Sequence, residues 1–350
     1  MSIFYNLLVK EVKRETPNAV SVVFEVPEEL KAKFNFIPGQ YVTIQKKLGD
    51  NTLRRAYSIC SSSNSDELRV AIKEVDQGIF SVYANKELKA GDSIELTIPE
   101  GKFILDVDSN NKNKYLAFVA GSGITPVFSM IKSVLETETE SEFALVYGNT
   151  SIEETIFKSE IDQLVKDYKD RFVVHYTYSQ EKNDNAYSGR INAEIVDKII
   201  KSKEDQLYFN AYFICGPEKM IDVVEERLIT NKVDKGLIKF ELFTSSEKEK
   251  VMDSDLSGNT EVTVILDEEE TTYQMNQKEL ILNTALDKGL DAPYSCQGGI
   301  CSSCLARVVE GSAEMEKNSI LSDEEVNEGL ILTCQAHPTS SSIKIDFDDV

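Results

Sequence analysis

Half of the six cysteines in this chain of 350 residues lie in one short segment, "PYSCQGGICSSC". Cys296, Cys301 and Cys304 have the spacing C-x4-C-x2-C, and Cys334 follows in "LTCQAHP". Four thiolates at this spacing predict the ligands of a 2Fe–2S cluster, and the glycines let the backbone wrap closely around it. A structural zinc site, which usually has two separated C-x2-C pairs, and free thiols are the alternatives.

A cluster of this kind moves one electron at a time, whereas hydride delivers two, so we expect a flavin as the converter. The segments "RRAYSIC" and "QGIFS" supply candidates for its site, which are Arg55, Ala56, Tyr57, Ser58, Gly78 and Ser81. An arginine and the first turn of a helix suit pyrophosphate, a tyrosine stacks on the flavin ring, and a serine reaches its reactive nitrogen. Taken singly, each of these residues is more often an ordinary surface residue of a strand.

Two further segments follow expected strands and open expected helices, "VAGSGITP" and "ICGPEKM". Their glycines permit a tight turn and close approach of the backbone to a dinucleotide phosphate, and proline suits a first helical turn. The candidates are Gly121, Gly123, Thr125, Pro126, Cys215, Gly216 and Pro217. A simple tight turn, and core packing of Cys215, are the alternatives.

The elements needed to position these residues fall into consecutive blocks. Residues 1–108 show short alternating strands, with a short helix from Phe80 to Glu87, and predict an antiparallel barrel or sandwich. Residues 109–247 alternate continuous apolar strands with helices and predict a doubly wound parallel sheet covered on both faces. Residues 248–259 are polar and predict a linker. Residues 260–350 predict a small α+β domain around the cysteines.

Composition narrows the class of protein. The net charge of −22 argues against a nucleic-acid partner, and no apolar run is long enough to predict a membrane span. The N-terminus has no basic leader or cleavage site, and Cys60 and the other scattered cysteines do not form a secreted disulfide framework, so we expect a cytoplasmic protein. From Asn259 onward 18 acidic and 5 basic residues give a net charge of −13, which predicts either solubility or steering of a basic partner.

Together these motifs resemble known families. The first two blocks resemble the ferredoxin–NADP⁺ reductase superfamily, which carries R-x-Y-S on an FAD-binding barrel, and G-x-G-x-T-P and C-G-P on the nicotinamide domain. The resemblance implies that residues 1–108 form an FAD-binding β-barrel and residues 109–247 an NAD(P)-binding domain. "APYSCQGGICSSC" with "LTCQAHP" resembles plant-type ferredoxins, whose domain is β-grasp-like. The whole chain is similar to reductase components of multicomponent oxygenases, most of all to those of the phenylacetyl-CoA epoxidase type.

The resemblance implies roles for individual residues. Arg55, Gly78 and Ser81 meet the FAD pyrophosphate, Tyr57 stacks on the flavin ring, and Ser58 reaches its N5. Thr125 and Cys215 lie beside the nicotinamide, so Ser58 and Cys215 are the expected catalytic residues. Phe243, in "FELFTSS", shields the flavin face in some relatives, and strand core is the equal alternative.

The choice of nucleotide shows one departure from the family. Relatives that prefer NADPH often have an arginine after the serine of "YS-R", where this chain has Gln180, and Arg190 follows ten residues later. The resemblance to epoxidase-type reductases nevertheless implies NADPH, with NADH possible.

The predicted function is transfer of hydride from NAD(P)H to FAD, and of single electrons through the cluster to a partner oxygenase. The alternatives are the reductase of a different ring-hydroxylating or hydrocarbon oxygenase, and an electron carrier that has lost flavin binding. A flavohaemoprotein-like activity requires a haem module, of which the sequence shows no sign.

Overall fold

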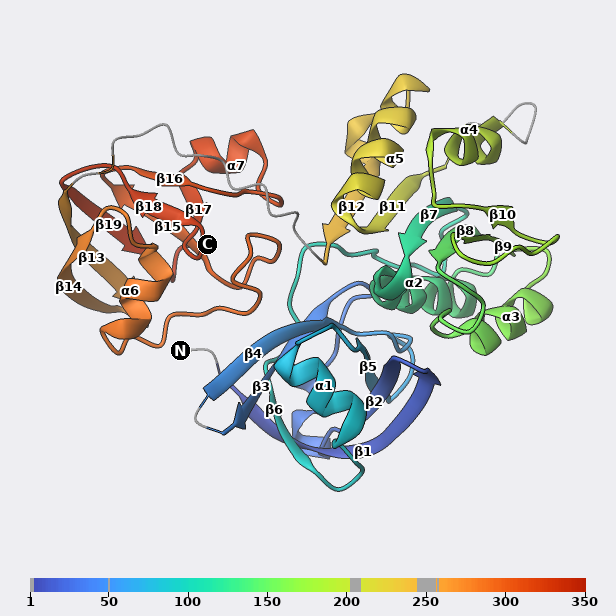
Figure 1. Cartoon of the computed structure of the whole chain (residues 1–350), viewed down its shortest axis with the longest axis horizontal. Helices are drawn as coiled ribbons and strands as arrows, with labels where there is room; N and C mark the ends of the chain where they lie inside the picture. Colours follow the sequence, from blue (N-terminus) through green and yellow to red (C-terminus); the bar gives the residue numbers. More distant parts are fainter. Residues whose placement is uncertain (1–2, 50, 202–208, 244–255, 257) are drawn as a thin grey trace. The chain divides into compact units, whose positions relative to one another are not determined.

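A computed structural model describes residues 3–49, 51–201, 209–243, 256 and 258–350 of the chain (Figure 1). The chain divides into two compact units, Tyr5–Phe243 and the C-terminal part, which we describe separately. Of the predicted linker 248–259, only Leu256, Gly258 and Asn259 are among the described residues. None of the helices in the described ranges is long and apolar enough to cross a membrane.

The first unit starts with six strands that pair antiparallel in the order β4-β3-β6-β1-β2-β5. Their bounds are β1 (Tyr5–Thr16), β2 (Ala19–Glu25), β3 (Tyr41–Leu48), β4 (Asn51–Ser58), β5 (Leu68–Lys73) and β6 (Ser93–Leu96). A bridge between Ile59 and Val70 joins the two edges of this sheet. The predicted antiparallel barrel is therefore confirmed, because closing the sheet removes its open edges.

One helix, α1 (Ile79–Lys86), packs on the barrel between β5 and β6, and a 3-10 helix spans Glu28–Lys33 (Figure 1). The predicted helix from Phe80 to Glu87 is confirmed to within one residue. Phe80 and Ala84 are i, i+4 neighbours and join the buried core of the barrel. This packing leaves the opposite face of α1 open to ligands or solvent.

The remainder of the first unit is a six-stranded parallel sheet in the order β10-β9-β8-β7-β11-β12. Its strands are β7 (Lys114–Ala120), β8 (Glu142–Asn149), β9 (Phe172–Tyr178), β10 (Tyr187–Ser188), β11 (Ala211–Gly216) and β12 (Ile238–Leu242). The helices are α2 (Ile124–Thr137), α3 (Lys158–Asp167), α4 (Ala193–Lys201) and α5 (Glu218–Thr230), with 3-10 turns at Gly121–Gly123 and Lys235–Leu237. Continuous apolar strands such as "YLAFVA" form this sheet because helices cover them on both sides.

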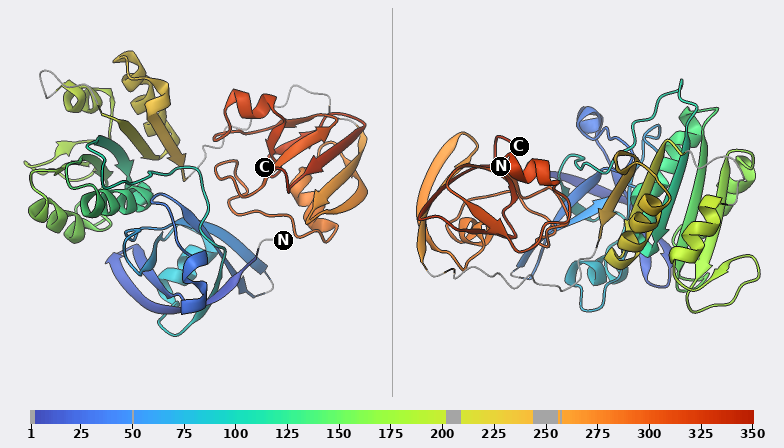
Figure 2. Two further views of the ribbon diagram at one scale, coloured as in Figure 1. Left: turned by 180° about the vertical axis from the view of Figure 1, so that it is seen from behind. Right: turned by 90° about the horizontal axis from the view of Figure 1, so that it is seen from above.

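The two faces of the parallel sheet carry different helices (Figures 1 and 2). α2 and α3 lie on one face, and α4 and α5, which contact each other, lie on the other. From β7 the chain builds the sheet outward through β8, β9 and β10 on one side. It then returns to add β11 and β12 on the other side of β7, so the strand order reverses between β7 and β11. Ligands of such sheets bind outside the carboxyl ends of the strands at this reversal.

One predicted helix begins later than expected. The helical spacing of residues 152–168 predicts a helix over that range, whereas α3 begins at Lys158. Phe157 has a left-handed φ of 59°, and its buried ring stacks on Phe128 with the centroids 4.6 Å apart. The apolar residues before Lys158 therefore anchor a turn in the core instead of continuing the helix.

An ion network ties the barrel to the parallel-sheet domain. Arg69 of β5 donates hydrogen bonds of 3.0 and 2.9 Å to the two carboxylate oxygens of Glu160 in α3, and one of 2.6 Å to Glu15 in β1. Burial alone raises the pKa of Glu160, but the hydrogen bonds from Arg69 and Lys13 outweigh it and lower the pKa to about 2. Such bidentate pairing of a buried arginine fixes the position of the barrel against the parallel-sheet domain.

The C-terminal unit contains a five-stranded mixed sheet in the order β14-β13-β19-β15-β17 and a two-stranded sheet of β16 and β18. The strands are β13 (Asn259–Leu266), β14 (Glu269–Asn276), β15 (Leu305–Glu310), β16 (Ala313–Met315), β17 (Leu330–Leu332), β18 (Ala336–Pro338) and β19 (Ser342–Asp346). The helices are α6 (Ile281–Asp287) and α7 (Asp323–Asn327). The helical spacing of residues 276–289 predicts a helix over that range, whereas α6 is shorter, because β14 pairs with β13 as far as Asn276.

Candidate functional site

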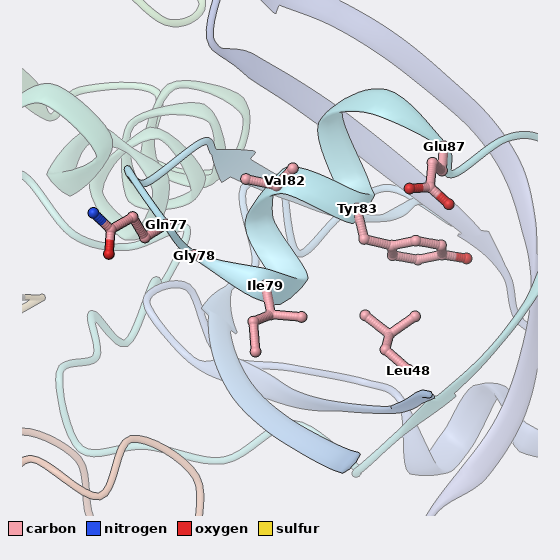
Figure 3. Close-up of a pocket in the computed structure, with 7 residues that line it drawn as sticks. All are labelled: Leu48, Gln77, Gly78, Ile79, Val82, Tyr83 and Glu87. Atoms are coloured by element: carbon pink, nitrogen blue, oxygen red, sulfur yellow. The ribbon is translucent and has the colours of Figure 1, made fainter. Parts of the chain in front are cut away.

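Strand β4 carries the R-x-Y-S segment along the barrel. Arg55 and Tyr57 stand two residues apart, so their side chains leave the same face of the strand. Arg55 is exposed, and the Tyr57 ring lies 5.7 Å from the Phe80 ring of α1. Burial raises the pKa of Tyr57. Tyr57 therefore lies beside α1, the helix at whose start Gly78 and Ser81 stand. A pocket of about 410 Å³ lies along the same helix (Figure 3).

The turn before α1 is held by its own polar groups. Gly78 is the N-cap of α1, and no side chain caps the helix. The Ser81 hydroxyl accepts a hydrogen bond of 3.1 Å from the Val75 N–H and donates one of 3.4 Å to the Gly78 carbonyl. Ser81 is thus engaged in shaping the turn, while the unpaired N–H groups of the first helical turn are the donors suited to a phosphate.

The glycine turn after β7 and the end of β11 are in direct contact. A Cβ on Gly123 would stand 2.2 Å from the Cys215 carbonyl oxygen, so only glycine fits there. Thr125 is buried and donates to the Ser122 carbonyl at 3.0 Å, and Pro126 lies in the first turn of α2. Ala56, between Arg55 and Tyr57 on β4, pairs with Thr43 of β3.

Cys215 lies next to Glu241, a residue that the sequence analysis did not assign to the site. Its thiol is buried, and burial, with Glu241 beside it in register on β12, raises the pKa of Cys215. Gly216 and Pro217 follow, and Pro217 is the N-cap of α5. The G-x-G and C-G-P turns therefore meet at the reversal point of the sheet.

Glu241 is the most unusual acid in the first unit. Burial raises the pKa of its carboxyl group to about 8, although a hydrogen bond from Ser58 opposes the shift. Its second carboxylate oxygen, Oε2, is buried and has no hydrogen-bond partner within the described part of the chain. This buried oxygen lies between Ser58 and Cys215 and lacks a hydrogen-bond partner. It therefore fits a site in which a bound polar ring supplies the missing hydrogen bond. The signal in the sequence was a charged residue inside the apolar strand segment "KFELF".

Lys73 is the second residue that sequence reasoning missed. Its Nζ atom lies 3.9 Å from the point where a Cβ on Gly121 would stand, so it reaches from the end of β5 across to the glycine turn. A cation beside that turn suits a dinucleotide phosphate. In the sequence Lys73 is one lysine of the segment "VAIKEV", and no motif there distinguishes it from a surface lysine.

The nucleotide-selecting segment and Phe243 lie at the carboxyl edge of the same sheet. The Gln180 N–H donates to the Thr150 carbonyl just beyond β9, and the Gly189 N–H donates to the Tyr178 carbonyl. Arg190 comes next in the chain, so its backbone also lies near the end of β9. Phe243 follows β12 directly and packs, partly buried, on the core of this unit.

In the C-terminal unit the four predicted ligands form two pairs. Cys296 is hydrogen-bonded to Cys301, and Cys304 to Cys334. Nowhere in the described ranges do three His, Cys, Asp or Glu side chains gather around one point. A 2Fe–2S cluster takes two thiolates on each of its two irons, so the donor set fits that cluster. Zinc prefers four ligands around one centre.

In the loop that carries these thiols, backbone N–H groups donate hydrogen bonds to sulfur. The hydrogen bond from Cys301, and those from backbone groups, lower the pKa of Cys296 to about 6. The Gly298 N–H lies 3.3 Å from the Cys296 sulfur. Gly299 has φ of 69°, and a Cβ there would stand 3.0 Å from the Lys317 carbonyl, so glycine is required. Backbone donors around a thiolate stabilise its anionic, metal-binding form.

Comparisons with known proteins give a consistent result. Three family models match: the oxidoreductase FAD-binding domain at residues 6–104, the oxidoreductase NAD-binding domain at 118–226, and the 2Fe-2S iron-sulfur cluster binding domain at 264–339. The chain is 36% identical to one of the subunits of the 1,2-phenylacetyl-CoA epoxidase of Escherichia coli (strain K12), over 99% of both chains. It is 34% identical to the ferredoxin reductase component of 3-ketosteroid-9-alpha-monooxygenase of Rhodococcus rhodochrous, over 97% of this chain and 96% of that one.

Solved structures show the same fold. Phthalate dioxygenase reductase matches with a TM-score of 0.62 at 23% identity, over 98% of each chain. A ferredoxin NADP+ reductase from Neisseria gonorrhoeae, solved with bound FAD and NADP, matches with a TM-score of 0.59 at 21% identity, over 68% of this chain and 98% of that one. Three consecutive cofactor domains and full-length relatives thus agree: the chain belongs to the ferredoxin–NADP⁺ reductase superfamily, among the reductase components that join FAD, NAD(P)H and 2Fe–2S domains in one polypeptide.

Proposed function

We propose that this chain is the reductase component of a multicomponent oxygenase of the phenylacetyl-CoA epoxidase type. Bound FAD takes hydride from NAD(P)H and supplies single electrons to the 2Fe–2S cluster. The observation that supports this role is the meeting of Ser58, Cys215 and Glu241 in one chain that also carries two pairs of cysteine thiols.

In this proposal the residues of the first unit have separate tasks. Arg55 and the first turn of α1, at Gly78, bind the pyrophosphate, and Tyr57 supports the flavin ring. The Ser58 hydroxyl, which donates to Glu241 in this structure, turns its single O–H donor to the reactive edge of the ring when the flavin binds. Gly121, Gly123, Thr125 and the C-G-P turn receive the nicotinamide nucleotide, and Cys215 excludes water beside it because its side chain is buried.

The four thiols of Cys296, Cys301, Cys304 and Cys334 hold the cluster in the C-terminal unit. The similarity to the phenylacetyl-CoA epoxidase component and to the ketosteroid monooxygenase component supports an oxygenase as the acceptor. All six cysteines are free, which suits a reducing compartment, and we propose the cytoplasm.

An anaerobic spectroscopic titration tests the proposal. The purified chain is expected to show flavin and 2Fe–2S absorbance that both bleach when NADPH is added. Adding an oxygenase component of the phenylacetyl-CoA epoxidase type then restores the cluster spectrum. Cluster absorbance without flavin would instead support an electron carrier, and reoxidation by a different oxygenase alone would reassign the partner.

A further inference from the structure

One glutamine side chain joins the two segments that carry the first and the last of the expected cluster ligands. Gln335 directly follows Cys334, and its Nε2 atom donates hydrogen bonds of 3.2 Å to the Gln297 carbonyl and 2.8 Å to the Cys334 carbonyl. Gln297 in turn directly follows Cys296. Gln335 and Gln297 are 38 positions apart along the chain, so the contact exists only in the folded unit. It holds the loop that begins at Cys296 against the segment of Cys334.

Backbone hydrogen bonds fix the position of Gln335 itself. Its N–H donates to the carbonyl of Leu332, the last residue of β17, at 2.9 Å. Its carbonyl accepts a hydrogen bond of 2.8 Å from the Glu316 N–H, next to the pair that Met315 of β16 makes with Ala336 of β18. Gln335 therefore projects from a backbone that strands hold on both sides, and a side chain on such a backbone positions its partners more precisely than one on a free loop.

The loop that Gln335 contacts has an unusual backbone. Gln297 has a left-handed φ of 52°, a region that residues with a Cβ rarely adopt, and Gly299 has φ of 69°. A Cβ on Gly299 would stand 3.0 Å from the Gln335 Cγ and 3.0 Å from the Lys317 carbonyl oxygen, so the loop packs directly on Gln335. The Ser319 N–H donates to the Gly299 carbonyl at 3.3 Å. A backbone in this conformation persists only where its surroundings hold it, and Gln335 is one of the residues that do so.

The same amide group also reaches sulfur. Besides its hydrogen bond with Cys304, the Cys334 sulfur accepts hydrogen bonds from the Gly299 N–H and from the Gln335 side chain. The amide nitrogen of Gln335 has two hydrogens for three acceptors, the two carbonyls and this sulfur, so the acceptors share the donors. A thiolate that binds iron carries more negative charge than a thiol and is therefore a stronger acceptor for one of these hydrogens.

We infer that Gln335 is a positioning residue for the 2Fe–2S cluster, which holds the Cys296 loop in place and, by donating to the Cys334 sulfur, raises the reduction potential. Reduction adds one electron, which the flavin supplies, and so increases the negative charge at the sulfurs. Hydrogen-bond donors stabilise that added charge and favour the reduced form. A loop held in place also limits the access of water and chelators to iron. The inference rests on the proposed function and assigns both effects to a residue that is not itself a ligand.

The test compares Gln335→Met with wild type in the full-length holoprotein. Methionine keeps an unbranched side chain to pack on Gly299 and removes both N–H donors. The variant is expected to release iron to a chelator about tenfold faster, and to shift the equilibrium between oxidised and reduced cluster about tenfold toward the oxidised form, given the usual strength of a hydrogen bond to a charged group. For a one-electron couple this shift lowers the midpoint potential by about 59 mV. Spectroelectrochemical titration measures the potential, and the absorbance of the iron chelate measures the release.

Gln335→Asn separates the two effects. Its amide is one methylene shorter, so it stays beside Cys334 but falls short of the Gln297 carbonyl. This variant is expected to release iron faster than wild type while keeping most of the wild-type potential. Gln274→Met on β14 is the matched control, because it makes the same change at an exposed glutamine whose Nε2 donates to Glu261. It should leave both the release rate and the potential unchanged.

A wild-type potential in Gln335→Met would overturn the inference, because a residue that only packs on the loop changes cluster retention and leaves the potential alone. Wild-type rates of iron release in both Gln335 variants would overturn it as well, since the loop would then be held without this side chain. If Gln335→Met takes up no cluster, the release rate of Gln335→Asn decides in the same way. A wild-type chain that carries no 2Fe–2S cluster would overturn the proposed function together with this inference.

Discussion

The Ser58 hydroxyl, at the end of β4, donates a hydrogen bond to the carboxyl group of Glu241 in β12. The barrel supplies the serine and the parallel sheet supplies the acid, so the contact exists only when both domains are folded together. Burial raises the pKa of Glu241 to about 8 and thus keeps the group protonated at neutral pH. A protonated carboxyl group therefore lies next to Ser58, the residue that we expect to face the flavin.

Replacing Glu241 by Gln tests this buried acid. An acid whose pKa rises from 4.5 to about 8 on folding is protonated in the folded state and ionised in the unfolded state between those values. Wild type therefore loses stability as the pH rises through that window, by up to about 1.4 kcal/mol for each unit of pKa difference, whereas E241Q does not.

Urea unfolding of both proteins at about pH 5 and about pH 9 measures the effect as a change in their relative free energy of unfolding. Glu11→Gln, at an exposed position of β1, is the matched control and should show no such change. A wild-type-to-E241Q difference that stays constant with pH would show that Glu241 ionises normally.

Arg55→Ala is expected to weaken FAD retention. Arg55 is exposed on β4, and losing a charge-assisted contact to pyrophosphate costs about 1.5–3 kcal/mol, or roughly ten- to a hundredfold in affinity. The flavin content after dialysis and the rate of flavin release check this. Full flavin content with an unchanged release rate would move the pyrophosphate away from Arg55.

Arg190→Ala is expected to raise the KM for NADPH by roughly tenfold and to leave the KM for NADH unchanged, because only NADPH carries the 2′-phosphate. Steady-state kinetics with both nucleotides provide the measurement. Lys198→Ala on α4, which removes an exposed lysine paired with Glu194, is the control. Parallel changes with both nucleotides would exclude Arg190 from the 2′-phosphate site.

Cys334→Ser is expected to abolish or degrade the 2Fe–2S spectrum while FAD remains bound, because the cluster loses its fourth thiolate and the flavin site lies in a separate unit. Iron analysis and visible absorbance report the cluster, and reduction of cytochrome c should fall while flavin reduction by NADPH persists. An intact cluster spectrum in this variant would remove Cys334 from the ligand set.

Raising the ionic strength is expected to slow electron transfer to the partner. Residues 259–350 carry a net charge of −13, and about 1 M salt shortens the Debye length to about 3 Å, which suppresses steering toward a basic surface. Stopped-flow traces should show cluster oxidation slowing with salt while hydride transfer from NAD(P)H changes little. A cluster-oxidation rate that is flat across the salt series would leave the acidic charge with no docking role.

Features that depend on residues close together in the chain were predictable from the sequence. The four cysteine ligands, the R-x-Y-S and G-x-G turns and the three classes of domain depend on spacing, on local backbone freedom and on hydrophobic periodicity, which a linear pattern displays. The short helix α1 was predictable for the same reason, since its apolar residues repeat at helical spacing.

Other features were decided only by the tertiary structure. Glu241 meets Ser58, Lys73 reaches Gly121, and Leu48 faces Tyr83, in each case across segments that are far apart along the chain. The late start of α3 at Lys158 has the same origin, because burial of Phe157 against Phe128 outweighs the local preference for helix. Burial, orphaned polar atoms and shifted pKa values arise where distant segments pack together and exclude water, and no spacing within one segment encodes that meeting.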